Sequence, residues 1–311
     1  MSRPASRHFL SLADHTDEDI RRYLHLARMV KLNPTGFRSA CSGKTLAMLF
    51  LKPSLRTRVS FQAGIFQLGG QGLYLGPTDI QLHRGETIAD TARVLSRYVD
   101  GIMARMFSHQ DLIDLSHYAT VPVINGLTDF NHPCQVLADL LTIEERFGRL
   151  AGLKISYIGD GNNMAHSLLL GCARMGMHVA VGHPADYAPD SGVVEQAQQL
   201  AARTGGSILI TTNAREAAHE ADVIYNDVWT SMGQEEETRT RLALFEGFQV
   251  NRELMACARP SAIFMHCLPA HRGEEVSAEV IDGPQSVVMD QAENRLHAQK
   301  AILVHLMGAR F

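Results

Sequence analysis

Runs of apolar residues alternate with amphipathic segments along almost the whole chain. Residues 46–51 are apolar at every position, which is typical of a strand buried on both faces of a parallel sheet. Residues 133–147 carry apolar side chains at i, i+3, i+4 and i+7, which predicts a helix with one apolar face. Strands are expected on this basis at 46–51, 101–105, 121–125, 155–159, 178–182, 207–211, 222–226 and 262–266, and helices at 58–68, 87–98, 133–147, 164–175 and 291–307.

The regular order of strand and helix predicts βαβ units, and therefore parallel sheets that bind ligands at the carboxyl ends of their strands. The length of 311 residues fits about two domains of roughly 100–200 residues each. The helical pattern breaks in glycines at 147–152. We therefore expect an α/β domain over 1–147, a second over 148–290 and a final helix over 291–311, with the functional site in a cleft between the domains.

Composition and charge exclude several classes of protein. Hydrophobic residues make up 45% and charged residues 20% of the chain, as in ordinary globular proteins and unlike disordered or collagen-like chains. The 29 basic and 33 acidic residues give a net charge of −4, so the chain lacks the overall basic field that non-specific nucleic-acid binding uses. We expect no nucleic acid as a partner.

Cysteine usage and the start of the chain indicate a reducing compartment. The five cysteines are scattered and never form a C-x-x-C pair, so free thiols are expected rather than disulfides or a zinc ribbon. The N-terminal segment has no apolar signal-peptide core, and no apolar run approaches the roughly 20 residues needed to cross a bilayer. The expectation is a cytoplasmic protein without a membrane partner.

The first candidate for chemistry is the segment 52–58, between an expected buried strand and a helix. A helix N-terminus offers N–H groups and a positive dipole end, which suit an anion. Ser54 and Thr57 add hydroxyl donors, and Arg56 adds a planar fork suited to phosphate. The glycines of a Walker loop are missing. An N-capping serine followed by solvated arginines is the alternative interpretation.

Two further segments carry polar residues at expected helix starts. Pro133 fits the first position of a helix and places His132 and Gln135 in one turn, where they can donate to a carbonyl oxygen and bind an amide NH2. In 159–163 the third glycine of a dinucleotide fingerprint is replaced by Met164, so nucleotide binding has weak support, and Asn163 is kept as a contact to a polar ligand. The segment around His132 could instead be a helix cap followed by an ordinary first turn.

The last two candidates follow expected strands of the second domain. Asp227 ends a strand, where its carboxylate can hold an amino group, and Trp229 beside it is expected to serve packing. Cys267 follows another strand, where a neighbouring histidine and an anion site could make its thiol reactive, although the Leu-Pro after it favours a turn whose carbonyls face a ligand. His266 and His271 lack a third ligand at metal-like spacing, so no metal is expected.

Five motifs occur in one order along the chain. They are Ser-Leu-Arg-Thr-Arg at 54–58, Arg105 at a strand end, His-Pro-Cys-Gln at 132–135, Asp-x-x-x-Ser-Met-Gly at 227–233 and His-Cys-Leu-Pro at 266–269. Together they are similar to the ornithine carbamoyltransferase family, and the resemblance extends from about Leu10 to the C-terminus. It implies a carbamoyl-phosphate domain followed by an ornithine domain, a final helix that packs back on the first domain, and homotrimers or multiples of trimers with sites at subunit interfaces.

The resemblance also implies an activity and site residues. The activity is transfer of the carbamoyl group of carbamoyl phosphate to the δ-amino group of L-ornithine, giving L-citrulline and phosphate without a cofactor, as in arginine biosynthesis. The residues that it implies for carbamoyl phosphate are Ser54, Leu55, Arg56, Thr57, Gln81, Arg105, His132, Gln135 and Arg295. Those for ornithine are Asn163, Asp227, Ser231, Met232, Cys267 and Leu268. Arg105, His132 and Cys267 are the expected catalytic residues.

These residue types fit the chemistry of the reaction. A neutral amine must attack the carbamoyl carbon, and Arg105, His132 and Thr57 are donors that can stabilise the resulting oxyanion. We hypothesise that Asp227 and Cys267 lower the cost of presenting the δ-amine without its proton.

One position departs from the family pattern. Leu55 stands where Thr or Gly is usual. Leucine keeps the expected backbone N–H contact and loses any contact through a hydroxyl group.

The nearest alternatives are carbamoyltransferases that use aspartate, putrescine or an N-acylated ornithine. Aspartate enzymes place a lysine in the loop corresponding to 79–87, and this chain has Arg84 but no lysine there. Ser-Met-Gly at 231–233 favours an amino acid with a free α-amino group. A nicotinamide dehydrogenase and a non-catalytic relative that keeps the fold are more distant alternatives. The biosynthetic or catabolic direction stays open.

Overall fold

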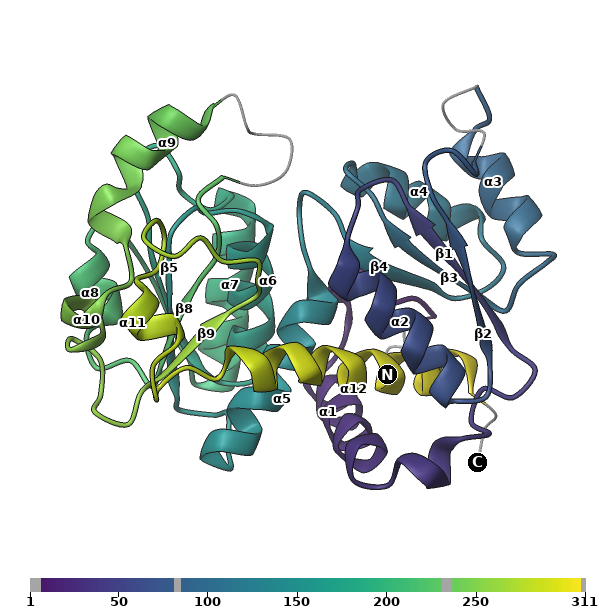
Figure 1. Cartoon of the computed structure of the whole chain (residues 1–311), viewed down its shortest axis with the longest axis horizontal. Helices are drawn as coiled ribbons and strands as arrows, with labels where there is room; N and C mark the ends of the chain where they lie inside the picture. Colours follow the sequence, from purple (N-terminus) through teal and green to yellow (C-terminus); the bar gives the residue numbers. More distant parts are fainter. Residues whose placement is uncertain (1–6, 81–84, 231–236, 309–311) are drawn as a thin grey trace. The chain divides into compact units, whose positions relative to one another are not determined.

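The computed structural model describes residues 7–80, 85–230 and 237–308. The chain folds as two compact units (Figure 1). Unit 1 comprises Met1–Leu141 and Asn294–Phe311, and unit 2 comprises Thr142–Glu293. Three of the expected site residues, Gln81, Ser231 and Met232, lie outside the described residues.

Unit 1 is built on a parallel sheet of four strands. They are β1 (Thr45–Phe50), β2 (Gln71–Leu75), β3 (Gly101–Arg105) and β4 (Val123–Leu127), in the order β2-β1-β3-β4. β1, β3 and β4 are buried along almost their whole length, which is why their sequences are nearly continuous apolar runs. The helices of this unit are α1 (Asp17–Leu32), α2 (Leu55–Gln67), α3 (Ile88–Leu95) and α4 (His109–Tyr118), with short 3-10 helices at Leu12–Asp14 and Pro34–Phe37.

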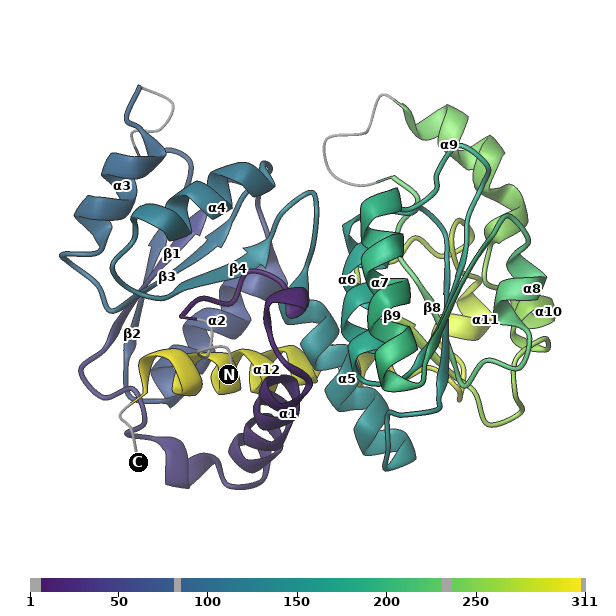
Figure 2. The same cartoon turned by 180° about the vertical axis from the view of Figure 1, so that it is seen from behind.

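The C-terminal helix α12 (Val288–Met307) belongs to unit 1 from Asn294 onward and lies beside α1 and α2 (Figures 1 and 2). Lys300 is 1% exposed, and its Nζ donates to Gln67 Oε1 of α2 at 3.0 Å. A Cβ at Gly64 would lie 3.2 Å from the Lys300 side chain, so the glycine lets the two helices approach closely. The expected packing of the final helix on the first domain is confirmed.

Unit 2 is built on a parallel sheet of five strands. They are β5 (Lys154–Ile158), β6 (His178–Gly182), β7 (Ser207–Thr211), β8 (Val223–Asn226) and β9 (Ile263–His266), in the order β7-β6-β5-β8-β9. α6 (Asn163–Arg174) and α7 (Ser191–Thr204) cover one face (Figures 1 and 2). α8 (Ala214–Ala218), α10 (Arg252–Met255) and α11 (Ala278–Ile281) lie on the other face. The other helices are α9 (Thr238–Phe245) and the 3-10 helix Glu246–Phe248, and α5 (Pro133–Phe147) begins in unit 1 and ends in unit 2.

The two parallel α/β sheets expected from the sequence are confirmed. Every expected strand is present, with ends no more than two residues from the predicted ones. β2 escaped prediction because its side chains are partly exposed and Gly72 interrupts its apolar pattern. α2 begins at Leu55 rather than at the predicted residue 58, because Ser54 caps it. Within the described ranges, no helix is both long enough and apolar enough to span a membrane.

Gly161, in the turn between β5 and α6, is required by close packing. A Cβ at this position would lie 2.2 Å from Pro189 N and 2.6 Å from Tyr187 O, and both are backbone atoms. The packing explains this glycine without a bound nucleotide.

We predict that Gly161→Ala lowers the free energy of unfolding by about 1–3 kcal/mol, because the added methyl group overpacks a rigid turn. Gly247→Ala is the matched control, since a Cβ there meets no atom within 4 Å. Urea unfolding of both variants measures the difference. Equal stability of the two variants would contradict the packing role.

Candidate active site

The segment after β1 forms the N-terminus of α2. Ser54 is the N-cap of this helix, and its Oγ accepts the Thr57 N–H at 3.2 Å. Leu55, the first helical residue, is 76% exposed, so its side chain projects into solvent. The departure from the family pattern at this position therefore leaves the helical backbone of the first turn unchanged.

Arg295 of α12 joins residues that are far apart in the sequence. Its Nη1 donates to Gln135 Oε1 of α5 at 2.6 Å, and its Nη2 donates to Thr57 Oγ1 of α2 at 3.1 Å. The three residues are only 3%, 1% and 1% exposed, respectively. The structure thus brings three of the expected carbamoyl-phosphate residues into direct contact.

Arg105 lies at the same end of the sheet because β1 and β3 are parallel neighbours and Arg105 pairs with Phe50. It is 7% exposed, and its Nε donates to Lys52 O at 3.2 Å. Lys52 was not among the expected site residues. Its Nζ lies 3.0 Å from Asp129 Oδ1, so an ion pair holds the segment that leads into α2.

His132 immediately precedes α5 and is almost completely buried. Burial lowers its pKa well below the usual value, and the positive charges of Arg295, Arg105 and Arg56 lower it further. The imidazole is therefore neutral at neutral pH and has one N–H to donate. The positive charges of these three arginines act on one buried site, and such charge suits a phosphate dianion.

A second cluster lies in unit 2, where β8 and β9 are neighbours and end together. Asp227 Oδ1 accepts the Cys267 thiol at 3.0 Å and the Val228 N–H at 2.8 Å. The structure thus places Asp227 and Cys267 together, as the sequence suggested.

Asn162, which precedes the expected site residue Asn163, was not among the expected site residues. It is the N-cap of α6, its Oδ1 accepts the Met164 N–H at 2.9 Å, and its Nδ2 donates to Asp227 Oδ2 at 3.4 Å. Tyr157 donates its hydroxyl to Asn162 at 3.2 Å, and burial and the Asp227 carboxylate raise the pKa of Tyr157 well above its usual value. Asn163 is the first residue of α6 and half-buried. The preference of asparagine for N-caps was the readable signal.

The turn after β9 contacts His266, which lies next to Glu275. Leu268 has a left-handed backbone with φ 57°, is followed by a cis bond to proline, and donates its N–H to His266 Nδ1 at 2.8 Å. His266 Nε2 lies 3.2 Å from Glu275 Oε1, and both side chains are completely buried. The Leu-Pro turn expected next to Cys267 is therefore present.

Asp227, His266 and Cys267 also lie close enough to share an ion, with one ligand atom of each within 4.8 Å of the others. Sequence spacing did not reveal Asp227 as a third ligand, because it comes from a different strand. Both ring nitrogens of His266 already face Leu268 and Glu275.

Arg241 of α9 was, like Lys52 and Asn162, not among the expected site residues. It is 5% exposed, and its Nη1 donates to Asp160 Oδ2 at 2.7 Å and to Trp229 O at 2.9 Å. Burial raises the pKa of Asp160, and the hydrogen bond from Arg241 opposes that shift. Trp229 packs against Phe245 with ring centroids 5.8 Å apart, which confirms its expected packing role.

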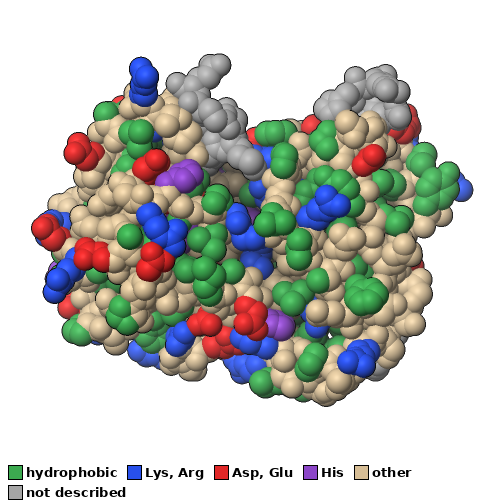
Figure 3. Space-filling view, in the orientation of Figure 1, with side chains coloured by type: hydrophobic (Ala, Val, Ile, Leu, Met, Phe, Trp, Pro, Cys, Tyr) green, Lys and Arg blue, Asp and Glu red, His purple; other side chains and the backbone are tan. Residues whose placement is uncertain are grey.

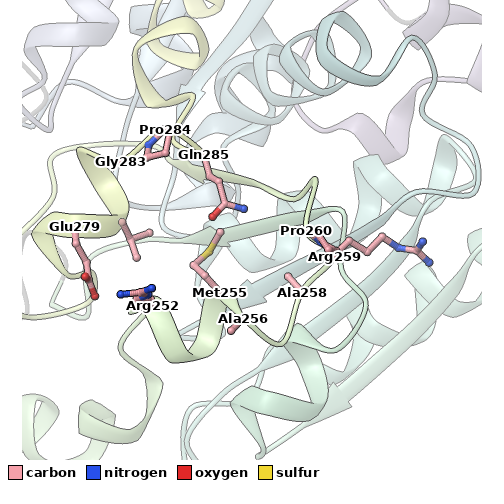
Figure 4. A pocket seen from close by; sticks show the side chains of 11 residues that line it. Arg252, Met255, Ala256, Ala258, Arg259, Pro260, Glu279, Gly283, Pro284 and Gln285 are labelled. Carbon is pink, nitrogen blue, oxygen red and sulfur yellow. The ribbon is translucent and has the colours of Figure 1, made fainter.

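A separate pocket of unit 2 opens at the beginning of β9, the end of that strand away from His266 (Figure 4). Its volume is ≈ 490 Å³, and the lining includes Arg252, Met255 and Glu279. The residues that line it include none of the expected site residues.

Comparison with known proteins assigns the family. Residues 7–145 match the family model described as aspartate/ornithine carbamoyltransferase, carbamoyl-P binding domain, and residues 151–306 match the model of the Asp/Orn binding domain. The chain belongs to the aspartate/ornithine carbamoyltransferase family. It is 59% identical to the ornithine carbamoyltransferase of Thermococcus kodakarensis, over 98% of this chain and 97% of that protein.

Similarity to ornithine carbamoyltransferase from Pyrococcus furiosus appears both in sequence and in a solved structure. The chain is 56% identical to an anabolic ornithine carbamoyltransferase, over 98% of this chain and 97% of that protein. A solved ornithine carbamoyltransferase structure is 55% identical, covers 99% of each chain and has a TM-score of 0.95. The resemblance read from the five motifs is confirmed. The nicotinamide dehydrogenase interpretation of 159–163 loses its support, in agreement with the packing role of Gly161.

We predict that the free energy of unfolding of this protein falls as the pH is lowered below about 6.5, because His132 is buried in its neutral form. The unfolded chain takes up a proton at this histidine near pH 6.5, whereas the folded form, with its lowered pKa, does not. The free energy of unfolding should therefore decline by up to about 1.4 kcal/mol per pH unit more in the wild type than in His132→Gln. Urea unfolding between pH 5 and pH 7.5 measures the two slopes, and identical slopes would contradict a buried, neutral His132.

Proposed function

We propose that this protein transfers the carbamoyl group of carbamoyl phosphate to the δ-amino group of L-ornithine, giving L-citrulline and phosphate. The observation that carries the proposal is the buried contact of Arg295 with Gln135 and Thr57, beside Arg105 and His132. This group of residues offers positive charge for a phosphate and N–H donors for a carbonyl oxygen within unit 1. Close relatives that carry the name ornithine carbamoyltransferase support the choice of substrate.

In this proposal the N-terminus of α2 binds the phosphate group. Its backbone N–H groups, including that of Leu55, and the positive end of the helix dipole favour an anion. Arginine forks add bidentate hydrogen bonds to phosphate oxygens. The binding residues are Ser54, Leu55, Arg56, Thr57 and Arg295, together with Gln81 outside the described residues.

Arg105 and His132 act on the carbonyl oxygen, which becomes negative when the amine attacks. A buried donor at a developing oxyanion contributes a factor of about 10²–10³ to the rate. The neutral imidazole of His132 can donate one hydrogen bond there without having to lose or gain a proton. The chemistry of carbamoyl transfer requires no redox cofactor or metal.

The residues of unit 2 hold ornithine. The Asp227 carboxylate suits an ammonium group, because its remaining lone pairs can accept N–H donors after the bonds from Cys267 and Val228. In the proposal, Cys267 and Leu268 lie beside the δ-amine of ornithine. The residues beside its α-amino and α-carboxylate groups are Asn163, Ser231 and Met232. A free α-amino group gains this charge pairing, and an acylated one does not.

The proposal includes a homotrimer, or a multiple of trimers, in the cytoplasm and a role in arginine biosynthesis. α2 carries an exposed apolar stripe, with Leu55, Val59 and Phe66 at 76%, 54% and 77% exposure, and hydrophobic side chains appear on the surface over this helix (Figure 3). Exposed apolar patches are typical of protein interfaces. All five cysteines are free thiols, which fits a reducing compartment. The anabolic relative supports the biosynthetic direction.

A colorimetric assay for ureido products tests the function. Purified protein and carbamoyl phosphate are offered L-ornithine, N-acetyl-L-ornithine, putrescine and L-aspartate in parallel. We expect product with L-ornithine, at a rate at least about tenfold above that with any other amine, because loss of one charge-assisted hydrogen bond costs about that factor. Product with N-acetyl-L-ornithine instead would overturn the role of Asp227, and absence of product with every amine would overturn the proposed activity.

A further inference from the structure

Asp139 lies one helical turn after Gln135 in α5, and the two side chains are 0% and 1% exposed. Gln135 Nε2 donates to Asp139 Oδ1 at 2.9 Å. On the other side of the same amide, Gln135 Oε1 accepts Arg295 Nη1 at 2.6 Å. The NH2 of the Gln135 amide thus donates to Asp139, and its oxygen accepts from Arg295.

The chemistry of these two neighbours determines the direction of the amide. A carboxylate only accepts hydrogen bonds, and a guanidinium only donates them. Rotating the amide by half a turn would set its NH2 against Arg295 and its oxygen against Asp139, so both hydrogen bonds would be lost inside a buried site. Gln135 therefore directs its oxygen, and not its NH2, toward the arginine side.

An oxygen that points this way selects a particular ligand. Arg105, His132 and Thr57 can donate to the oxygens of a carbonyl or phosphoryl group, but a ligand N–H needs an acceptor. Gln135 Oε1 has a second lone pair to accept one. A carbamoyl group carries an NH2 where an acetyl group carries a methyl, so this oxygen can tell the two apart.

We propose that Asp139 is a positioning residue that fixes the Gln135 amide to accept an N–H of the carbamoyl group, and thereby sets the preference for carbamoyl over acyl phosphates. The inference rests on the proposed function, because it requires the carbamoyl group to lie beside Gln135. Arg295 alone does not hold the amide during turnover, since a bound phosphate offers its guanidinium a charged acceptor. Asp139 is on the same helix as Gln135 and keeps its contact whichever ligand is bound.

Two stable ligands that differ only at the deciding group provide the probes. Phosphonoacetamide carries the NH2, and 2-oxopropylphosphonate carries a methyl group in its place. Titration calorimetry gives the dissociation constant of each, and their ratio is the preference. In the wild type we expect phosphonoacetamide to bind about tenfold more tightly or better, since its N–H is matched by an acceptor.

Asp139→Leu removes the acceptor from the buried site and should reduce the preference to within about twofold, with the affinity for 2-oxopropylphosphonate changed less than about threefold. Asp139→Asn keeps the size of the side chain but can donate to Gln135 as well as accept from it, so it no longer fixes the direction of the amide and should also lower the preference. A structural defect alone would weaken both ligands equally and leave the ratio unchanged. Asp139→Ala replaces the leucine variant if that variant fails to unfold cooperatively.

A double-mutant cycle shows whether Asp139 acts through Gln135. Gln135→Leu and the double variant Gln135→Leu/Asp139→Leu should have the same preference, because nothing remains for Asp139 to orient. If the wild type binds neither ligand, the proposed carbamoyl-phosphate site is wrong. If it binds both equally, Gln135 does not select the NH2 group. If the wild type shows the preference and Asp139→Leu or Asp139→Ala keeps it, the positioning role of Asp139 is wrong.

Discussion

The buried guanidinium of Arg295 is the group on which the first cluster depends. It is 3% exposed, and burial of a positive charge is costly unless its donors find acceptors. Two of those acceptors, Thr57 Oγ1 and Gln135 Oε1, come from α2 and α5, so a single side chain ties α12 to both helices. The packing of the C-terminal helix on unit 1 therefore holds this cluster together: without it, the amide of Gln135 and the hydroxyl of Thr57 lose a common donor, and His132 loses one of the positive charges that lower its pKa.

Parallel sheet geometry explains how segments distant in sequence form each cluster. Neighbouring parallel strands end at the same edge, so the residues that follow β1 and β3 meet in unit 1, and those that follow β8 and β9 meet in unit 2. Arg105 thus reaches the carbonyl of Lys52, and Cys267 reaches the carboxylate of Asp227. Each cluster combines a helix N-terminus with side chains from strand ends. The two units thus use the same arrangement of elements.

The sequence predicted those features that depend on local pattern or on strand order. Apolar runs gave the strands of both sheets, except for the partly exposed β2. Ser54 and Gln135 were found as polar residues at helix starts, because caps and first turns have recognisable residue types. The resemblance to the family added Arg295, whose partners no local pattern could reveal.

Other residues could not be predicted because their roles depend on partners far along the chain. Asp139 lies in an apolar helical stretch, and its proposed role follows only from the contacts of the Gln135 amide with Asp139 and Arg295. In the sequence, Arg241 resembles any other charged residue of a polar segment. In the structure it is buried and donates to Asp160, 81 residues earlier. Lys52 resembled an ordinary polar residue of a loop and pairs with Asp129. Only Asn162 carried a signal that could have been used, its position as an N-cap.

The most direct test of the account is the affinity of carbamoyl phosphate for the wild type and for Arg295→Gln, measured by titration calorimetry at neutral pH. The account predicts that the wild type binds and that the variant binds about 10–100-fold more weakly, which is the range for loss of hydrogen bonds from a charged group. Arg97→Ala serves as the control, because Arg97 is exposed and precedes β3, at the end of that strand away from Arg105, and its loss should leave the affinity unchanged. Equal affinity of Arg295→Gln and the wild type, with both proteins folded, would contradict the claim that this buried guanidinium is held in place for the phosphate.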